Sequence, residues 1–146
     1  MRKIADIMSA DCITITPQSD IKEAASMMKE HDIGFIPVIE GRKLVGVVTD
    51  RDLVIRGYAN NHDGSTSVSQ VLSDNVRTIS PDVSVDEAAA MMSSGQIRRL
   101  PVVENGHLVG IVSLGDLAIR EIFVNEAGEA LSGISEQEGQ SSQFAH

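Results

Sequence analysis

Aromatic residues and cysteine are scarce in this sequence, and each shortage narrows what the protein can be. Phe and Tyr make up 3% of the 146 residues and Trp is absent, so a core must be built from Ile, Val, Leu, Ala and Met. Cys12 is the only cysteine, which excludes a disulfide within the chain and favours a reducing compartment. No apolar stretch approaches the roughly 20 residues that span a bilayer, and the N-terminus lacks the apolar run of a signal peptide. We therefore expect a soluble, cytoplasmic protein that has no membrane partner.

Basic residues are also few. The chain has 12 Lys and Arg against 21 Asp and Glu, which gives a formal net charge of −9 at pH 7. Nucleic-acid affinity comes largely from clustered Lys and Arg that neutralise phosphates. The charge balance therefore argues against nucleic acid as a partner.

A gapless internal repeat organises the chain. Residues 4–56 align with residues 68–120 at a constant offset of 64, and 21 of the 53 aligned positions are identical. The length is sufficient for one domain with a real core. We predict repeat one over residues 1–60, a polar linker over 61–67, repeat two over 68–125, and the end of the last helix followed by a disordered acidic tail over 126–146.

Each copy predicts the element order β-α-β-β-α. A short β-like run ends at Pro17 or Pro81, and the helix that follows has apolar residues at the i, i+3, i+4, i+7 spacing of a buried face. These residues are Ile21, Ala24, Ala25 and Met28 in the first copy, and Val85, Ala88, Ala89 and Met92 in the second. The next strand contains Pro37 or Pro101, so we expect it at a sheet edge or with a bulge, because proline cannot donate to a ladder.

The last strand of each copy runs straight into a second helix, which we expect over residues 52–58 and 116–123. At both junctions a hydroxyl residue precedes an aspartate by three positions: Thr49 with Asp52, and Ser113 with Asp116. One interpretation is helix capping, worth about 1 kcal/mol per cap, although Asp is shorter than the usual Glu and should reach back less easily. The other is ligand binding, because a helix N-terminus favours a phosphate and a carboxylate there suits a ribose diol. The two are compatible, and the duplication favours binding.

Arg98 and Arg99 precede the strand proline in the second copy, where their planar guanidinium groups could bind a phosphate. Because side chains alternate along a strand, at most one of them should contact a ligand. The first copy has Gly34 and Phe35 at these positions, which would offer a close backbone approach and an apolar wall for adenine. This difference puts the equivalence of the two copies in question.

We find no residues that predict catalysis or a metal site. No nucleophile has a visible base partner, the four histidines lack metal-ligand spacing, and Cys12 is expected to be a small buried residue. The run Asp50-Arg51-Asp52 fits caps and surface pairs better than Mg²⁺ binding. We expect a protein that is not an enzyme and requires no cofactor.

The element order, the Ile36-Pro37-Val38 and Leu100-Pro101-Val102 strands, and the Gly-x-x-Thr/Ser-x-x-Asp junctions together resemble the CBS domain. Two in tandem resemble a CBS pair, also called a Bateman module, over about residues 1–125. The resemblance implies an α+β (α/β-like) fold in which two β-α-β-β-α repeats pack with pseudo-twofold symmetry and leave two clefts between them.

The resemblance also implies a function. Such modules bind regulatory adenosine-containing ligands such as AMP, ADP, ATP or S-adenosylmethionine, with Asp52 and Asp116 on the ribose hydroxyls and Thr49 and Ser113 near the phosphate. They commonly form homodimers, and this chain would signal to an unknown protein partner in trans. The alternative is a structural dimerisation or interaction protein without a small-molecule ligand.

Overall fold

The computed structural model describes residues 2–117, and the predicted order of elements recurs in both copies. Its main elements are the helices α1 (Ile21–His31) and α3 (Val85–Gly95) and the strands β1 (Phe35–Glu40), β2 (Lys43–Thr49), β3 (Arg99–Glu104) and β4 (His107–Ser113). A helical run follows β2 as α2 (Asp50–Asp52), the π-helical η2 (Leu53–Gly57) and the 3-10 helix η3 (Tyr58–Asn60). Residues 114–117 are helical after β4. The predictions for residues 118–146 lie outside the described residues.

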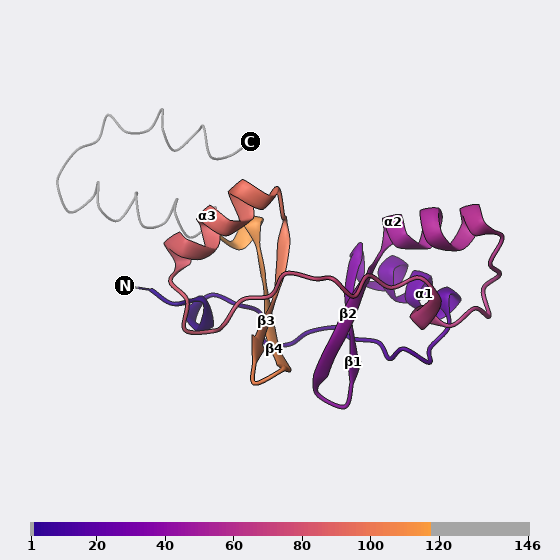
Figure 1. Ribbon diagram of the computed structural model, residues 1–146, viewed down its shortest axis with the longest axis horizontal. Helices are drawn as coiled ribbons and strands as arrows, with labels where there is room; N and C mark the ends of the chain where they lie inside the picture. The colour runs from indigo at the N-terminus through magenta and orange to yellow at the C-terminus, as the bar shows by residue number, and fades with distance from the viewer. Residues whose placement is uncertain (1, 118–146) are drawn as a thin grey trace.

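The strands form one four-stranded antiparallel sheet in the order β1-β2-β4-β3, so the predicted α+β fold is confirmed. The two hairpins are joined near their turns, where Lys43 of β2 pairs with His107 of β4. There the Leu44 amide donates to Gly106 at 3.1 Å and the Leu108 amide donates to Arg42 at 2.9 Å. These two bonds are related by the same offset of 64 as the sequence repeat, as expected for a pseudo-twofold axis between the turns. Figure 1 shows each hairpin with its helices as a separate lobe.

Both proline-containing strands lie at the outer edges of this sheet, and each has a register shift. The shift follows Val38 in β1 and Val102 in β3. The expected edge position and bulge are both confirmed. The preceding β-like run is reduced to one parallel bridge, in which the Ile15 amide donates to the Pro37 carbonyl at 3.1 Å.

The first helix of each copy is capped by the side chain of the residue that precedes it. Asp20 accepts from the Glu23 amide at 2.8 Å, and Ser84 accepts from the Glu87 amide at 3.1 Å. The predicted apolar face is largely buried, but Ala25 is exposed. The buried face of α1 therefore differs from the predicted one. It lacks Ala25 and includes Met27, which packs against the core.

The N-terminal segment of each repeat packs in the core of the other repeat. Ile4, at the start of η1 (Ile4–Asp6), is fully buried in the cluster of β3, β4 and α3. Val68, at the start of η4 (Val68–Gln70), is fully buried in the cluster of β1, β2 and α1. In Figure 1 the indigo N-terminal segment accordingly starts beside α3 and then crosses to the lobe of α1. Because the chain crosses twice, both repeats contribute to the space between the lobes.

Each crossing segment also pairs with the strand that ends in the other repeat's junction. Ser9 exchanges two backbone hydrogen bonds with Ile111 of β4, at 2.8 and 2.9 Å, and Ser73 exchanges two with Val47 of β2 at the same distances. The crossing segments therefore lie directly beside the hydroxyl and aspartate residues of the junctions.

The segment predicted as a linker, residues 61–67, is hydrogen-bonded along the start of α1. The Ile21 amide donates to the Thr66 carbonyl at 2.8 Å, and the Lys22 amide donates to the Gly64 carbonyl at 3.2 Å. This segment leads the chain from the lobe of repeat one into η4 of the same lobe before the second crossing.

Candidate functional site

Both junctions are closed by reciprocal caps. The Thr49 hydroxyl accepts from the Asp52 amide at 3.1 Å, and the Asp52 carboxylate accepts from the Thr49 amide at 3.0 Å. Ser113 and Asp116 make the same pair of bonds at 3.0 and 3.2 Å. The capping interpretation is confirmed, and the expectation that Asp would reach back less easily was wrong. Because the last strand residue is itself the cap, the helices begin at residues 50 and 114, earlier than predicted.

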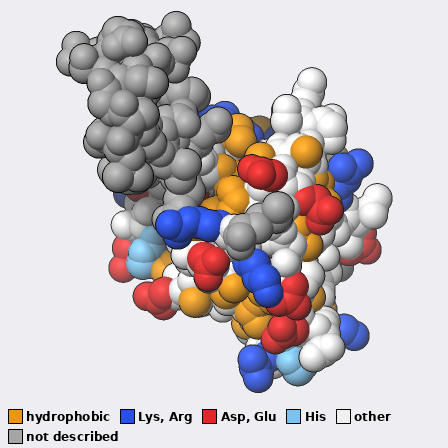
Figure 2. All heavy atoms as spheres, turned by 90° about the vertical axis from the view of Figure 1, so that its left-hand side faces the viewer, with side chains coloured by type: hydrophobic (Ala, Val, Ile, Leu, Met, Phe, Trp, Pro, Cys, Tyr) orange, Lys and Arg blue, Asp and Glu red, His pale blue; other side chains and the backbone are white. Residues whose placement is uncertain are grey.

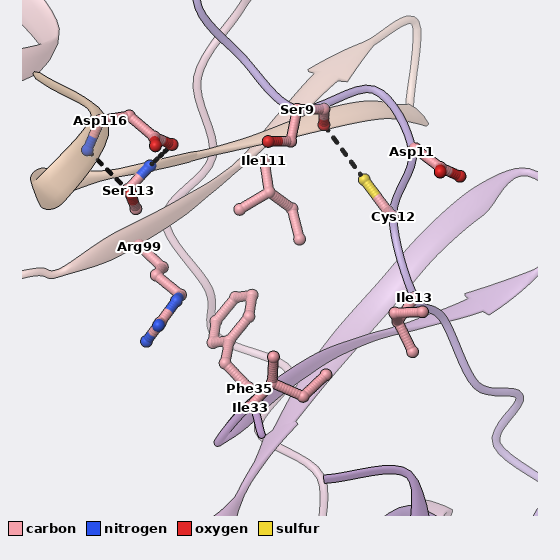
Figure 3. A pocket seen from close by; sticks show the side chains of 10 residues that line it. All are labelled: Ser9, Asp11, Cys12, Ile13, Ile33, Phe35, Arg99, Ile111, Ser113 and Asp116. Atoms are coloured by element: carbon pink, nitrogen blue, oxygen red, sulfur yellow. Dashed lines mark hydrogen bonds between the residues drawn. The ribbon is translucent and has the colours of Figure 1, made fainter. Parts of the chain in front are cut away.

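The junction of repeat two lines a cavity of about 290 Å³ between the two repeats, and Figure 3 shows its walls. Small-molecule pockets generally run from roughly 300 to 1,000 Å³, so this one lies just below that range. Three separate stretches of the chain form it: Ser9, Asp11, Cys12 and Ile13 from the first crossing segment, Ile33 and Phe35 from repeat one, and Arg99, Ile111, Ser113 and Asp116 from repeat two. We call this cavity the Asp116 cleft.

Arg99 and Phe35 extend into the same part of the Asp116 cleft (Figure 3). Arg99 is the register partner of Ser113, so it lies beside the junction. Arg98 is not among the residues that line this cleft, and its carbonyl accepts from the Leu114 amide at 2.8 Å. The cleft thus combines one guanidinium, one carboxylate at a helix start and an apolar wall.

Gly34 does not line this cleft. Asp50 of the same chain, and not a ligand, packs closely against its backbone. Its carbonyl accepts from the Asp50 amide at 3.0 Å. A Cβ at this position would lie 2.8 Å from a carboxylate oxygen of Asp50. The backbone opening predicted at Gly34 is therefore filled by Asp50.

The junction of repeat one is tied to the second crossing segment. The Ser73 hydroxyl donates to the two carboxylate oxygens of Asp52 at 3.3 and 3.4 Å. Arg56 Nε lies 3.8 Å from the same carboxylate, and Arg56 Nη1 donates to the Leu72 carbonyl at 3.0 Å. Asp52 is only 9% exposed. Of the eight predicted site residues, the Asp116 cleft brings together Phe35, Arg99, Ser113 and Asp116, whereas Gly34, Thr49, Asp52 and Arg98 do not line it.

Cys12 is half-buried at the wall of the Asp116 cleft, so its prediction as a buried residue was wrong. Its thiol donates to the Ser9 carbonyl at 3.4 Å. Burial and the neighbouring Asp11 carboxylate raise the pKa of the thiol. Sequence reasoning missed this wall because nothing local to residues 9–13 indicates that they pair with a strand of the other repeat.

A second, smaller cavity of about 210 Å³ is lined by Asp11 and Cys12 of the first crossing segment and by Arg42 near the turn between β1 and β2. Within residues 2–117, no group of three or more His, Cys, Asp or Glu side chains could hold a metal ion. Over the same residues, no helix is long and apolar enough to cross a membrane. Figure 2 shows acidic and basic side chains interspersed on the face that repeat two presents.

Comparison with known proteins gives consistent matches. The family model of the CBS domain matches residues 4–57 and 68–121. The CBS domain-containing protein YhcV of Bacillus subtilis is 44% identical over 137 residues, which cover 94% of this chain and 98% of YhcV. The structure of the AcuB protein from Vibrio cholerae aligns with a TM-score of 0.81 at 28% identity, over 89% of this chain and 97% of that one. The CBS domain pair of protein MJ0100, in complex with 5′-methylthioadenosine and S-adenosyl-L-methionine, aligns with a TM-score of 0.71 at 30% identity, over 86% of this chain and 98% of that one.

Proposed function

This chain belongs to the CBS domain family as a tandem pair, and on that basis we propose that it is a regulatory module that binds an adenosine-containing ligand between its repeats. The observation that supports this most is the Asp116 cleft, where both repeats and a crossing segment surround one cavity. The adenosyl ligands of the MJ0100 pair support the ligand class. AMP, ADP, ATP and S-adenosylmethionine are the candidates.

In this proposal each wall of the cleft has one task. Asp116 accepts from the ribose hydroxyls with the lone pairs that the Ser113 amide does not use. Arg99 and the start of the helix at residue 114 bind the phosphate or another polar group on the 5′ carbon. Phe35 and Ile33 pack against the adenine ring.

The test is a thermal-shift and calorimetric titration with AMP, ADP, ATP, S-adenosylmethionine and NADH. A ligand at 100 times its Kd should stabilise the folded chain by about 2.7 kcal/mol. Asp116→Ala should abolish the shift, whereas Asp82→Ala, in an exposed turn that does not line the cleft, should retain it. A chain that responds to none of the five compounds would instead support the structural dimerisation protein. Recovery of the bound ligand unchanged would support a module that is not an enzyme.

We further propose that the module acts as a homodimer. Val54, Ile55 and Tyr58 lie close together on the helical run after β2, and they are 56%, 51% and 83% exposed. A cluster of exposed large apolar side chains is typical of a protein interface. Sedimentation should give a dimer for the wild type and for Gln18→Asp, a substitution at an exposed turn, and a monomer for Ile55→Asp. Ile55→Asp remaining a dimer would exclude this face.

The output would act in trans. A ligand that contacts both repeats changes the relative stability of their arrangements, and a protein partner that prefers one arrangement senses the change. Small-angle scattering of the dimer with and without the bound ligand tests this step. Identical scattering in both states would contradict it.

A further inference from the structure

The two junction aspartates are not equally available to a ligand. Asp52 is 9% exposed, whereas Asp116 is half-buried and lines a cavity of about 290 Å³. From this difference, and resting on the function proposed above, we infer that the chain binds one adenosyl ligand, at Asp116. We further infer that Ser73 keeps the carboxylate of Asp52 from taking a second one.

Ser73 and Ser9 occupy equivalent positions in the repeat, and their backbones are held in the same way. Ser73 pairs with Val47 through hydrogen bonds of 2.8 and 2.9 Å, and Ser9 pairs with Ile111 through bonds of the same lengths. The difference lies in the side chains. The Ser73 hydroxyl donates to Asp52, whereas Ser9 is exposed and lines the cleft beside Asp116. Over residues 2–117, Ser9 makes no hydrogen bond to Asp116.

The bonds at Asp52 use the acceptors that a ribose diol would need. A carboxylate has about four lone-pair sites. At Asp52 the Thr49 amide takes one, and the Ser73 hydroxyl spans both oxygens. A ligand that bound there would have to displace Ser73 and reach a side chain that is almost fully buried. At Asp116 the Ser113 amide is the only hydrogen-bond partner within the described part of the chain.

Cys12 provides a reporter for the Asp116 cleft and for a smaller cavity of about 210 Å³ that it also lines, so loss of protection in Asp116→Ala assigns the protection to the cleft. Cys12 is the only cysteine of the chain and lines that cleft. The equivalent position in the second crossing segment is Val76. A ligand in the Asp116 cleft should therefore shield the thiol from alkylation.

The experiment combines calorimetric stoichiometry with the rate of Cys12 alkylation by N-ethylmaleimide, using AMP and 5′-methylthioadenosine as probes. For the wild type we expect one ligand per chain. At ten times Kd the alkylation should slow about tenfold, as mass action requires for a shielded thiol. Ser73→Ala should add a second site per chain, and Ser26→Ala, the matched control at an exposed position of α1 that does not line the cleft, should leave the stoichiometry at one. Circular dichroism melts verify that both variants are folded.

The outcomes separate the two proposals. Three results would overturn this inference while an adenosyl-binding module remains. They are two sites on the wild type, one site that leaves the alkylation rate of Cys12 unchanged, and a Ser73→Ala variant that stays at one site. Absence of binding by every probe would overturn the proposed function and this inference together.

Discussion

Repeat one and repeat two have the same backbone and different sites. Their corresponding backbone hydrogen bonds recur at the offset of 64, for example from Ile33 to Met28 at 3.0 Å and from Ile97 to Met92 at 2.9 Å. Both junctions have the same reciprocal cap. The side chains around the caps differ: the Ser73 hydroxyl donates to Asp52, whereas Arg99 and Phe35 line the cleft beside Asp116. The two repeats therefore share one backbone frame and differ in the side chains around their junctions.

The largest difference in stability between equivalent substitutions in the two repeats should appear at Gly46 and Gly110. A Cβ at Gly46 would lie 2.6 Å from the Ser73 carbonyl oxygen, which is backbone and cannot move aside. A Cβ at Gly110 would meet the flexible Met8 side chain at 2.6 Å, and the Ser9 carbonyl only at 3.0 Å. Gly46→Ala should lower the free energy of unfolding by about 3 kcal/mol and Gly110→Ala by about 1 kcal/mol. Urea denaturation measures both, and equal losses would contradict the expected asymmetry.

The packing of the N-terminal segment of repeat one in the core of repeat two can be tested by substitution of Ile4. Ile4 is fully buried in the core of repeat two. Ile4→Ala should lower the free energy of unfolding by about 3 kcal/mol, and Ile4→Val by about 1 kcal/mol. If Ile4→Ala left thermal unfolding unchanged, the segment would not belong to that core.

Much of the fold could be predicted because its signals are local. The buried faces of α1 and α3 and the edge position of the strands with proline depend on neighbouring residues, and both were largely predicted from the local sequence. The exchange of segments could not be predicted in this way. Ile4 and Val68 are apolar wherever they pack, and their own sequence does not specify which repeat's core receives them.

The residues that line the Asp116 cleft were predictable only in part. Asp116 and Ser113 were identified because duplication and helix-start spacing are visible in the sequence, and Arg99 because of its place before the proline. Cys12 and Ile13 were missed because they face the cleft only after the crossing segment has paired with β4. The hydrogen bond that occupies Asp52 could not be predicted either, because its donor, Ser73, lies beyond the linker in the sequence.

In the absence of ligand, the two aspartates should differ in their effect on stability. Asp52→Ala removes a buried cap and leaves the Ser73 hydroxyl and Arg56 without their acceptor, so we expect a loss of about 2 kcal/mol. Asp116→Ala removes a half-buried cap, with an expected loss of about 1 kcal/mol. Thermal melts of both variants provide the measurement. A larger loss for Asp116→Ala would contradict the conclusion that Asp52 is the more buried and more fully hydrogen-bonded of the two aspartates.

Ligand charge should distinguish nucleotides at the Asp116 cleft. Among residues 2–117, Arg99 is the only basic side chain that lines it, against the carboxylates of Asp11 and Asp116, in a chain of net charge −9. AMP should therefore bind more tightly than ATP. Asp11→Asn should improve ATP affinity about fivefold, corresponding to roughly 1 kcal/mol, and Asp82→Asn serves as the matched control. Calorimetry at two salt concentrations measures the difference, and tighter binding of ATP to the wild type would contradict this charge argument.

The smallest expected effect concerns the pH dependence of Cys12. Burial and Asp11 raise the pKa of this thiol, and the thiolate is the reactive form. Alkylation of the folded chain should therefore be slower than that of the urea-unfolded chain near neutral pH, and its rate should keep rising with pH beyond the point at which the unfolded chain levels off. Equal rates in the two states at pH 7.5 would show that the cleft wall does not shield the thiol.

A crystal structure with AMP bound tests the central claim most directly. The account predicts one nucleotide per chain, with its ribose on Asp116, its phosphate near Arg99 and its adenine against Phe35. Asp52 should keep its hydrogen bond to Ser73. A nucleotide whose ribose lies on Asp52, or one bound outside the space between the repeats, would contradict the account.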